Sequence, residues 1–213
     1  MQTENQEQLQ EATAPETNNI TFDFENFPSG QLPYGWSQYF SGKGGTNWQT
    51  AIDDGNKVLA QLYSNNPGNH FNIVVNDSIR LKNMTLTVRL KGITGKEDQG
   101  GGLIWRFTDK DNYYIVRANP LENNVVLYKV QEGKRGDLPL VGKGKTYGVK
   151  VEPLGNTWHA LKLIVKDDLF TVFLDDKELY KVQDSTFTFE GKIGLWTKAD
   201  AVTWFDDYMA VPD

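Results

Sequence analysis

The sequence predicts an all-β protein, a two-sheet antiparallel β-sandwich with almost no helix. Short runs that alternate apolar and polar residues recur from Ile20 onward at a spacing of roughly 10 residues, with turn residues between them. Aromatic residues make up 12% of the 213-residue chain, and aromatic side chains favour the half-buried surfaces of strands. No segment keeps apolar residues at a 3.6-residue period over several turns, as an amphipathic helix would.

The individual strands follow from this alternation. Asp167-Asp168 and Asp175-Asp176 predict tight turns, because Asp tolerates left-handed backbone, so consecutive antiparallel hairpins are expected there. Residues 132–156 are rich in Gly and Lys and predict a long loop with one edge strand around 148–151. The expected strands are 20–24, 36–40, 48–52, 57–63, 70–75, 84–90, 102–108, 113–118, 125–131, 158–166, 170–174, 178–182, 191–198 and 202–211.

Composition and charge exclude several classes of function. The net charge of −6 and the lack of a basic patch argue against a nucleic-acid partner, which would need clustered Lys and Arg. The chain has no Cys, which excludes disulfides, thiol catalysis and Cys-based zinc sites. No apolar run approaches the roughly 18 residues that a membrane span needs.

The first 19 residues differ in composition from the rest of the chain. They are polar and rich in Glu and Gln, so they cannot bury enough apolar surface to fold alone. We expect a disordered tether at 1–19 followed by one domain at 20–213. A spacer behind a signal peptide or lipid anchor would have this composition, which predicts a periplasmic, outer-surface or secreted location. An ordinary frayed terminus is the alternative.

Four segments resemble the concanavalin A-like lectin/glucanase (jelly-roll) superfamily, and bacterial domains allied to laminarinase-like and keto-disaccharide hydrolases in particular. The resemblance covers about residues 20–211 and is stronger for fold than for activity. The segments are FDFENFPSGQLPYGW, GGLIWRFTDKDNYYIVRANPLENNVVLYKV, WHALKLIVKDDLFTVFLDDKELYKV and GKIGLWTKADAVTWFDDYMAV.

The resemblance implies a catalytic acid motif, but this chain lacks that motif. Laminarinase-like enzymes carry E-x-D-x-x-E on one strand, and hydrolysis of a glycosidic bond needs two carboxyl groups. The acidic runs at Glu97-Asp98 and at 175–178 have other spacings and fall in expected turns. We therefore assign no catalytic residue. A glycoside hydrolase with a different acid pair stays an alternative, as does a structural or protein-interaction sandwich.

Alternation also assigns side chains to the two faces of the middle strands. If Trp105 and Tyr114 point into the core, the neighbouring polar side chains line the outer, concave sheet, where the resembled superfamily places its ligands. Trp196 alternates with Ile193 and Leu195 and is the best candidate for an exposed aromatic platform. The predicted ligand-binding residues are Arg106, Tyr113, Arg117, Asn119 and Trp196.

The function that these residues predict is binding of a polysaccharide outside the cytoplasm. Arg presents a planar pair of donors, which suits a polyol or the carboxylate of a uronic acid. The alternative for the same residues is a solvated sheet with cross-strand pairs between Arg and acidic side chains. Carbohydrate is the expected partner in the first case.

A structural calcium ion is a further expectation from the resemblance. Laminarinase-like sandwiches tie the first strand to an Asp of the last strand through calcium, which prefers several hard oxygen ligands. The last-strand run DYMAV begins at Asp207, and Asp23 and Glu25 share one face of the first strand. The alternative is that Asp206 and Asp207 only solvate the exposed end of the last strand.

Overall fold

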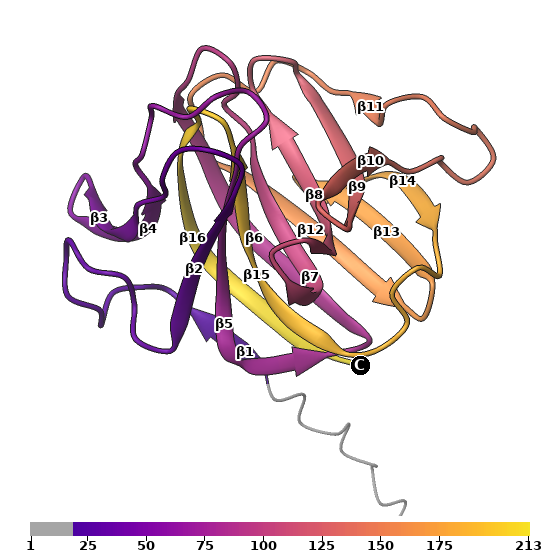
Figure 1. The fold of residues 1–213 in the computed structure, drawn as a ribbon, viewed down its shortest axis with the longest axis horizontal. Helices are drawn as coiled ribbons and strands as arrows, with labels where there is room; N and C mark the ends of the chain where they lie inside the picture. The colour runs from indigo at the N-terminus through magenta and orange to yellow at the C-terminus, as the bar shows by residue number, and fades with distance from the viewer. Residues whose placement is uncertain (1–18) are drawn as a thin grey trace, which may run out of the picture.

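The computed structural model describes residues 19–213 and consists of two antiparallel sheets of eight strands each (Figure 1). The predicted all-β sandwich is therefore confirmed. No helix in the described range is long and apolar enough to cross a membrane. Of the expected tether at 1–19, only Asn19 falls within the described residues.

Sheet A contains the first and last strands of the domain. The short strand β1 (Ile20–Phe22) pairs with β16 near its C-terminal end. The other strands, in spatial order, are β14 (Lys177–Gln183), β13 (Leu169–Leu174), β12 (His159–Lys166), β6 (Met84–Thr94), β16 (Val202–Pro212), β4 (Asn56–Gln61) and β3 (Trp48–Asp53).

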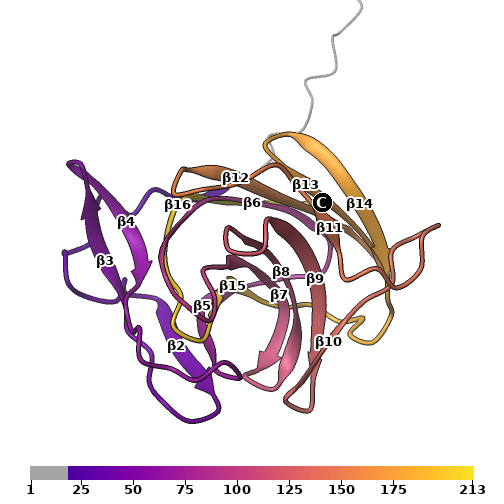
Figure 2. The ribbon, with the colours of Figure 1, turned by 90° about the horizontal axis from the view of Figure 1, so that it is seen from above.

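Sheet B is curved, and its concave face is the one turned away from sheet A (Figure 2). Strand β11 (Val149–Lys150) pairs with β9 beside the main path of the sheet. The other strands, in spatial order, are β10 (Lys134–Asp137), β9 (Asn124–Gln131), β8 (Asn112–Asn119), β7 (Gly101–Asp109), β15 (Gly191–Lys198), β5 (Phe71–Leu81) and β2 (Trp36–Ser41).

The main hydrophobic core lies between the two sheets. Trp105 and Tyr114 from neighbouring strands of sheet B stack with ring centroids 5.3 Å apart, and both pack against Phe170 of sheet A. All three side chains are fully buried. The inward orientation that alternation predicts for Trp105 and Tyr114 is thus confirmed.

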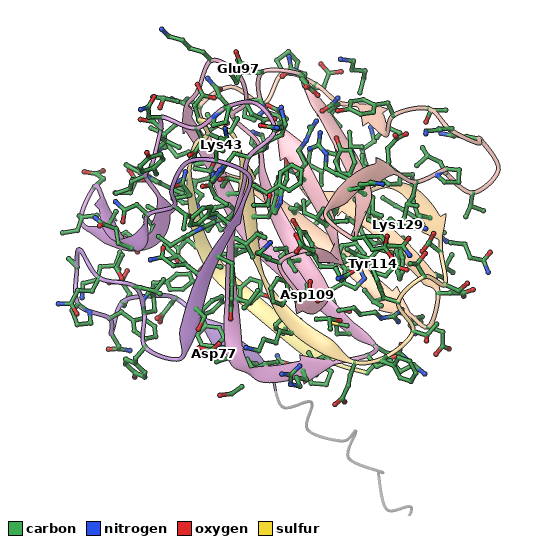
Figure 3. All side chains as sticks on the ribbon, viewed as in Figure 1. Lys43, Asp77, Glu97, Asp109, Tyr114 and Lys129 are labelled. Carbon is green, nitrogen blue, oxygen red and sulfur yellow. The ribbon has the colours of Figure 1, made fainter. Side chains whose placement is uncertain are left out.

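Asp184 connects the two sheets at one end of the sandwich. It follows β14 of sheet A and accepts hydrogen bonds from two residues of sheet B, from the Tyr114 hydroxyl at 2.6 Å and from Lys129 Nζ at 3.0 Å. Figure 3 shows Tyr114 and Lys129 in the same region of the molecule. This carboxylate therefore links the edge of sheet A to β8 and β9.

The predicted long loop at 132–156 contains more regular structure than expected. Its edge strand around 148–151 is present as β11, but residues 134–137 form a second strand, β10. That strand returns antiparallel along β9 after a two-residue turn. The prediction missed β10, which places a residue on the concave face.

Candidate ligand site on the concave face of sheet B

The concave face of sheet B carries a second buried apolar cluster, separate from the core between the sheets. Its rings and aliphatic side chains form a floor along β5, β15, β7, β8 and β9. Trp196 lies within it and donates its indole N–H to the Tyr113 hydroxyl at 3.3 Å. The members are Phe71, Ile73, Val75, Ile104, Phe107, Tyr113, Ile115, Val126, Tyr128, Val130 and Trp196, with Tyr39 packed against them.

The β9–β10 hairpin brings Arg135 over this floor. Glu132 and Gly133 both have positive φ, 52° and 73°, as the favoured two-residue hairpin turn requires. The turn sets the register that pairs Arg135 with Val130. Directly opposed residues of an antiparallel pair point to the same face, so Arg135 points to the concave side with Val130.

The guanidinium of Arg135 rests among three aromatic rings. Its central carbon lies 4.4 Å from the ring centroid of Tyr128, 5.3 Å from that of Phe71 and 5.8 Å from that of Trp196. A cation within about 6 Å of a ring centroid is attracted by the negative face of the ring. The rings therefore hold the guanidinium in place and restrict its rotamers.

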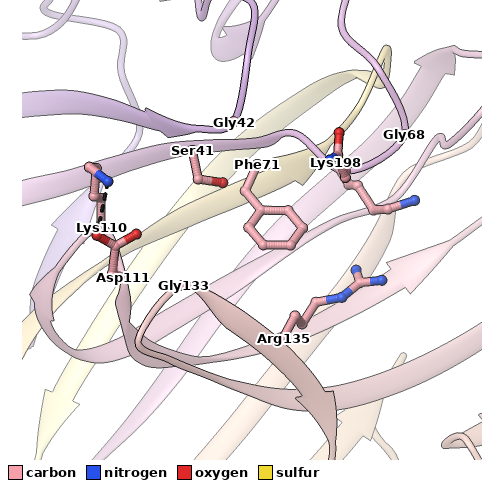
Figure 4. Close-up of a pocket in the computed structure, with 10 residues that line it drawn as sticks. Ser41, Gly42, Gly68, Phe71, Lys110, Asp111, Gly133, Arg135 and Lys198 are labelled. Carbon is pink, nitrogen blue, oxygen red and sulfur yellow. Dashed lines mark hydrogen bonds and ion pairs between the residues drawn. The ribbon is translucent and has the colours of Figure 1, made fainter.

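A cavity of about 510 Å³ opens above Phe71 and Arg135 (Figure 4). Lys110 and Asp111 form an ion pair at 2.9 Å on one side of Phe71, and Arg135 and Lys198 lie on the other. The wall thus carries three cations and one carboxylate. The lining residues are Ser41, Gly42, Gly68, Asn69, Phe71, Lys110, Asp111, Gly133, Arg135 and Lys198.

Arg117 is fixed beneath the hairpin by a network of side chains. It donates to Glu122 Oε2 at 2.7 Å, to the Tyr128 hydroxyl at 3.2 Å and to Asn124 Oδ1. Burial opposes its charge, but Tyr128, Asp98 and Glu122 together raise the pKa of Arg117 above its ordinary value. Burial likewise disfavours the Glu122 carboxylate, yet Arg117 keeps the pKa of Glu122 below its usual range. The network orients Tyr128, on which Arg135 stacks.

Asn119 belongs to a second network centred on the buried Asp98. Asp98 Oδ1 accepts from Asn119 Nδ2 at 3.1 Å and from the backbone N–H of Gly100 at 2.7 Å. Asp98 Oδ2 pairs with Lys198 Nζ at 3.3 Å. Asp98 therefore sets the position of the Lys198 ammonium in the cavity wall.

The structure brings four of the five predicted ligand residues to the concave side, but as supports beneath the surface. Tyr113, Arg117, Asn119 and Trp196 are at most 1% exposed. The expectation that Trp196 forms an exposed platform is wrong, because Arg135 and neighbouring rings cover it. Direct contact of these four residues with a ligand stays a prediction.

Arg106 does not lie on the concave face, where alternation placed it. It has a positive φ of 49°, and the pairing of β7 shifts register beyond Trp105. Such a bulge inserts an extra residue and reverses the alternation. The guanidinium lies 5.6 Å from the ring centroid of Phe170, on the side of the inter-sheet core. It donates to backbone carbonyl groups of Phe187, Lys82 and Asp167.

The three residues predicted for calcium have other partners. Asp207 pairs with Arg89 at 3.2 Å, and Glu25 Oε1 accepts from the backbone N–H of Lys57 at 2.8 Å. Asp23 Oδ1 accepts from the backbone N–H of Glu25 at 3.2 Å. Within residues 19–213 no group of three or more His, Cys, Asp or Glu side chains is arranged to hold a metal ion. Calcium binding stays a prediction from the sequence.

The sequence prediction missed Arg135, the most prominent polar residue of the cavity. The signal was present in Gln131-Glu132-Gly133-Lys134, since a Gly-containing pair between two alternating runs is typical of a hairpin. A two-residue turn sets Gln131 opposite Lys134 and Val130 opposite Arg135, and directly opposed residues share a face, so this hairpin places Arg135 on the face of Val130. The missed strand therefore led to the missed residue.

A family model described as the 3-keto-alpha-glucoside-1,2-lyase-like domain matches residues 31–209. The chain belongs to this family. The match includes both sheets of the sandwich except β1 and the last residues of β16. It also includes every residue that lines the cavity. No curated protein matches the chain in sequence.

Solved structures share the fold of this 3-keto-alpha-glucoside-1,2-lyase-like domain. Carbohydrate binding module CBM66 from Bacillus subtilis is 21% identical, with 82% of this chain and 93% of that chain covered and a TM-score of 0.60. The cellulose induced protein Cip1 is 13% identical, with 91% and 97% covered and a TM-score of 0.61. A putative glycosyl hydrolase from Parabacteroides distasonis is 13% identical, with 84% and 88% covered and a TM-score of 0.51. These likenesses confirm the jelly-roll fold.

Proposed function

We propose that this domain binds carbohydrate in the cavity on the concave face of sheet B. The observation that carries the proposal is the composition of that cavity, in which the ring of Phe71 is edged by polar and charged side chains. Phe71 offers an apolar surface, while Asn69 and Lys198 offer polar groups for hydrogen bonds. Ligand sites in proteins commonly combine an apolar surface with a few convergent polar groups. The structural similarity to a carbohydrate binding module supports the same function.

The size and rigidity of the cavity also fit a sugar ligand. Its volume of about 510 Å³ falls within the usual range for small-molecule sites, about 300–1,000 Å³. Asp98 holds Lys198 through an ion pair and three aromatic rings hold Arg135, so these two cations need little ordering when a ligand binds. An extracytoplasmic location stays a prediction from the sequence.

Filling the cavity should abolish binding without disturbing the core. Asn69 is an exposed loop residue in the cavity wall, so Asn69→Trp adds bulk where the ligand would lie. We expect glycan affinity to fall at least ten-fold, about 1.4 kcal/mol, in affinity gels and titration calorimetry. Asn65→Trp, an exposed position of the same loop outside the lining, is the control and should bind normally. Equal binding by both variants would place the glycan elsewhere.

Family membership favours a second candidate function, cleavage of a 3-keto-glucoside in the same cavity. A lyase needs a group that accepts a proton, and Asp111 is the one carboxyl group in the lining. The Asp111→Asn variant should then lose cleavage while still retaining glycan on an affinity gel. Chromatography of the products from a 3-keto-glucoside would measure this. Absence of product with the unaltered domain would leave binding as the function.

A further inference from the structure

Arg135 differs from the other cations of the cavity because it lacks an acidic partner. Lys110 pairs with Asp111, and Lys198 pairs with Asp98. None of the ion pairs within residues 19–213 includes Arg135. Its Nη1 atom is buried and has no hydrogen-bond partner in the same range. The guanidinium thus keeps both its charge and an unused donor.

Stacking on the aromatic rings leaves the N–H donors of the Arg135 guanidinium without an acceptor. The aromatic faces of Tyr128, Phe71 and Trp196 attract the positive charge, but they offer no acceptor to the N–H groups at the guanidinium edge. A buried N–H without an acceptor is costly, and the cost is relieved when a ligand supplies one. The surrounding rings also exclude water, which strengthens an ionic hydrogen bond formed there.

The charge of the cavity contrasts with that of the whole chain. The net charge of the protein is −6, which repels acidic polymers in general, whereas the cavity wall holds three cations and one carboxylate. A ligand with a single negative group in the cavity is attracted by these cations. The guanidinium fork matches the two oxygens of a planar carboxylate better than it matches isolated hydroxyl groups.

We propose that the cavity selects sugars that carry a carboxylate, and that Arg135 is the specificity-determining residue. This inference rests on the proposed function, because it names the class of carbohydrate bound at the same site. Arg135 donates two hydrogen bonds to the uronate carboxylate, and Phe71 faces the sugar ring. Asn69 is exposed on the wall, where a ring hydroxyl group would be placed.

The test compares each acidic glycan with its own neutral derivative. Oligosaccharides of galacturonate, mannuronate and glucuronate are titrated in native form and after reduction of the carboxyl groups to alcohols. At least one native oligosaccharide should bind ten-fold or more tightly than its reduced form, and rising NaCl concentration should weaken that preference. The Arg135→Met variant should lose the preference, and Arg135→Lys should keep only part of it.

Lys134 provides a matched control on the same strand. It is exposed and does not line the cavity, so Lys134→Met removes one positive charge and should leave the preference intact. Circular dichroism of each variant checks folding. Equal binding of native and reduced glycans would overturn carboxylate selection while the proposed function stands. Preference for a sulfated neutral glycan would overturn it as well, and binding of no glycan would overturn both proposals.

Discussion

The Arg106 guanidinium joins three separate turns at one end of the sandwich. Its acceptors are the carbonyl of Lys82 in the β5–β6 turn, that of Asp167 in the β12–β13 turn and that of Phe187 between β14 and β15. The Arg106 side chain is itself buried, and hydrogen bonds that involve a charged group contribute more to stability than neutral ones. Arg106 therefore supports the connections of the fold, whereas Arg135 has no such partners.

Replacing Arg106 with Met should destabilise the domain and leave ligand selection unchanged. Met keeps much of the side-chain volume but leaves three carbonyl groups without a donor, which should lower the free energy of unfolding by about 3 kcal/mol. Urea unfolding measures this. Arg89→Met is the control, because Arg89 and its partner Asp207 are 45% and 54% exposed and such pairs contribute at most about 1 kcal/mol. Similar losses for both variants would contradict a special role for Arg106.

At the scale of strands, the sequence predicts most elements because their alternation is regular and their turns carry recognisable residues. The hairpins from β12 to β14 follow from the Asp pairs, whose members Asp167, Asp175 and Asp176 all have positive φ in the structure. The inward faces of β7 and β8 follow equally well from Trp105 and Tyr114. These elements could be predicted since local pattern and tertiary packing agree there.

The two errors at this scale have physical causes that a period-two pattern does not reveal. The bulge at Arg106 adds one residue to β7 relative to its neighbour β15, and one extra residue moves a side chain to the opposite face. Strand β10 has only four residues and lies at the sheet edge, so its alternation is too short to stand out. Both errors concern the candidate site, because alternation predicts Arg106 as a site residue and does not predict Arg135.

The sequence also does not predict that side chains on the concave face are buried. Alternation assigned Tyr113 and Trp196 to the correct side of sheet B, but it could not show that this face holds its own apolar cluster. The cluster exists because the sheet curves and the β9–β10 hairpin covers part of it. The solvent exposure of these side chains therefore depends on the curvature of the whole sheet, and the pattern of a single strand does not predict that curvature.

At the scale of the whole molecule, Asp184 adds a polar link between the two sheets to the hydrophobic core that lies between them. Burial disfavours its charge, but hydrogen bonds from Thr186, Tyr114 and Lys129 keep the pKa of Asp184 below its usual range. A carboxylate whose pKa is lower in the folded state stabilises the fold above its unfolded pKa, about 3.9 for Asp. This contribution is lost as the pH falls through the folded pKa. The link between the sheets should therefore weaken in acid.

Asp184→Asn tests this link through the pH dependence of stability. At pH 7 the substitution removes the negative charge that Lys129 and Tyr114 stabilise, and we expect a loss of about 2 kcal/mol in the free energy of unfolding. Below pH 4 the unaltered protein loses the same contribution by protonation, so the two stability curves from urea unfolding should converge. Asp176→Asn is the control, because that carboxylate is 94% exposed and its replacement should cost little. A constant difference between pH 7 and pH 3 would show that Asp184 acts through packing alone, and its charge would then contribute nothing to holding the two sheets together.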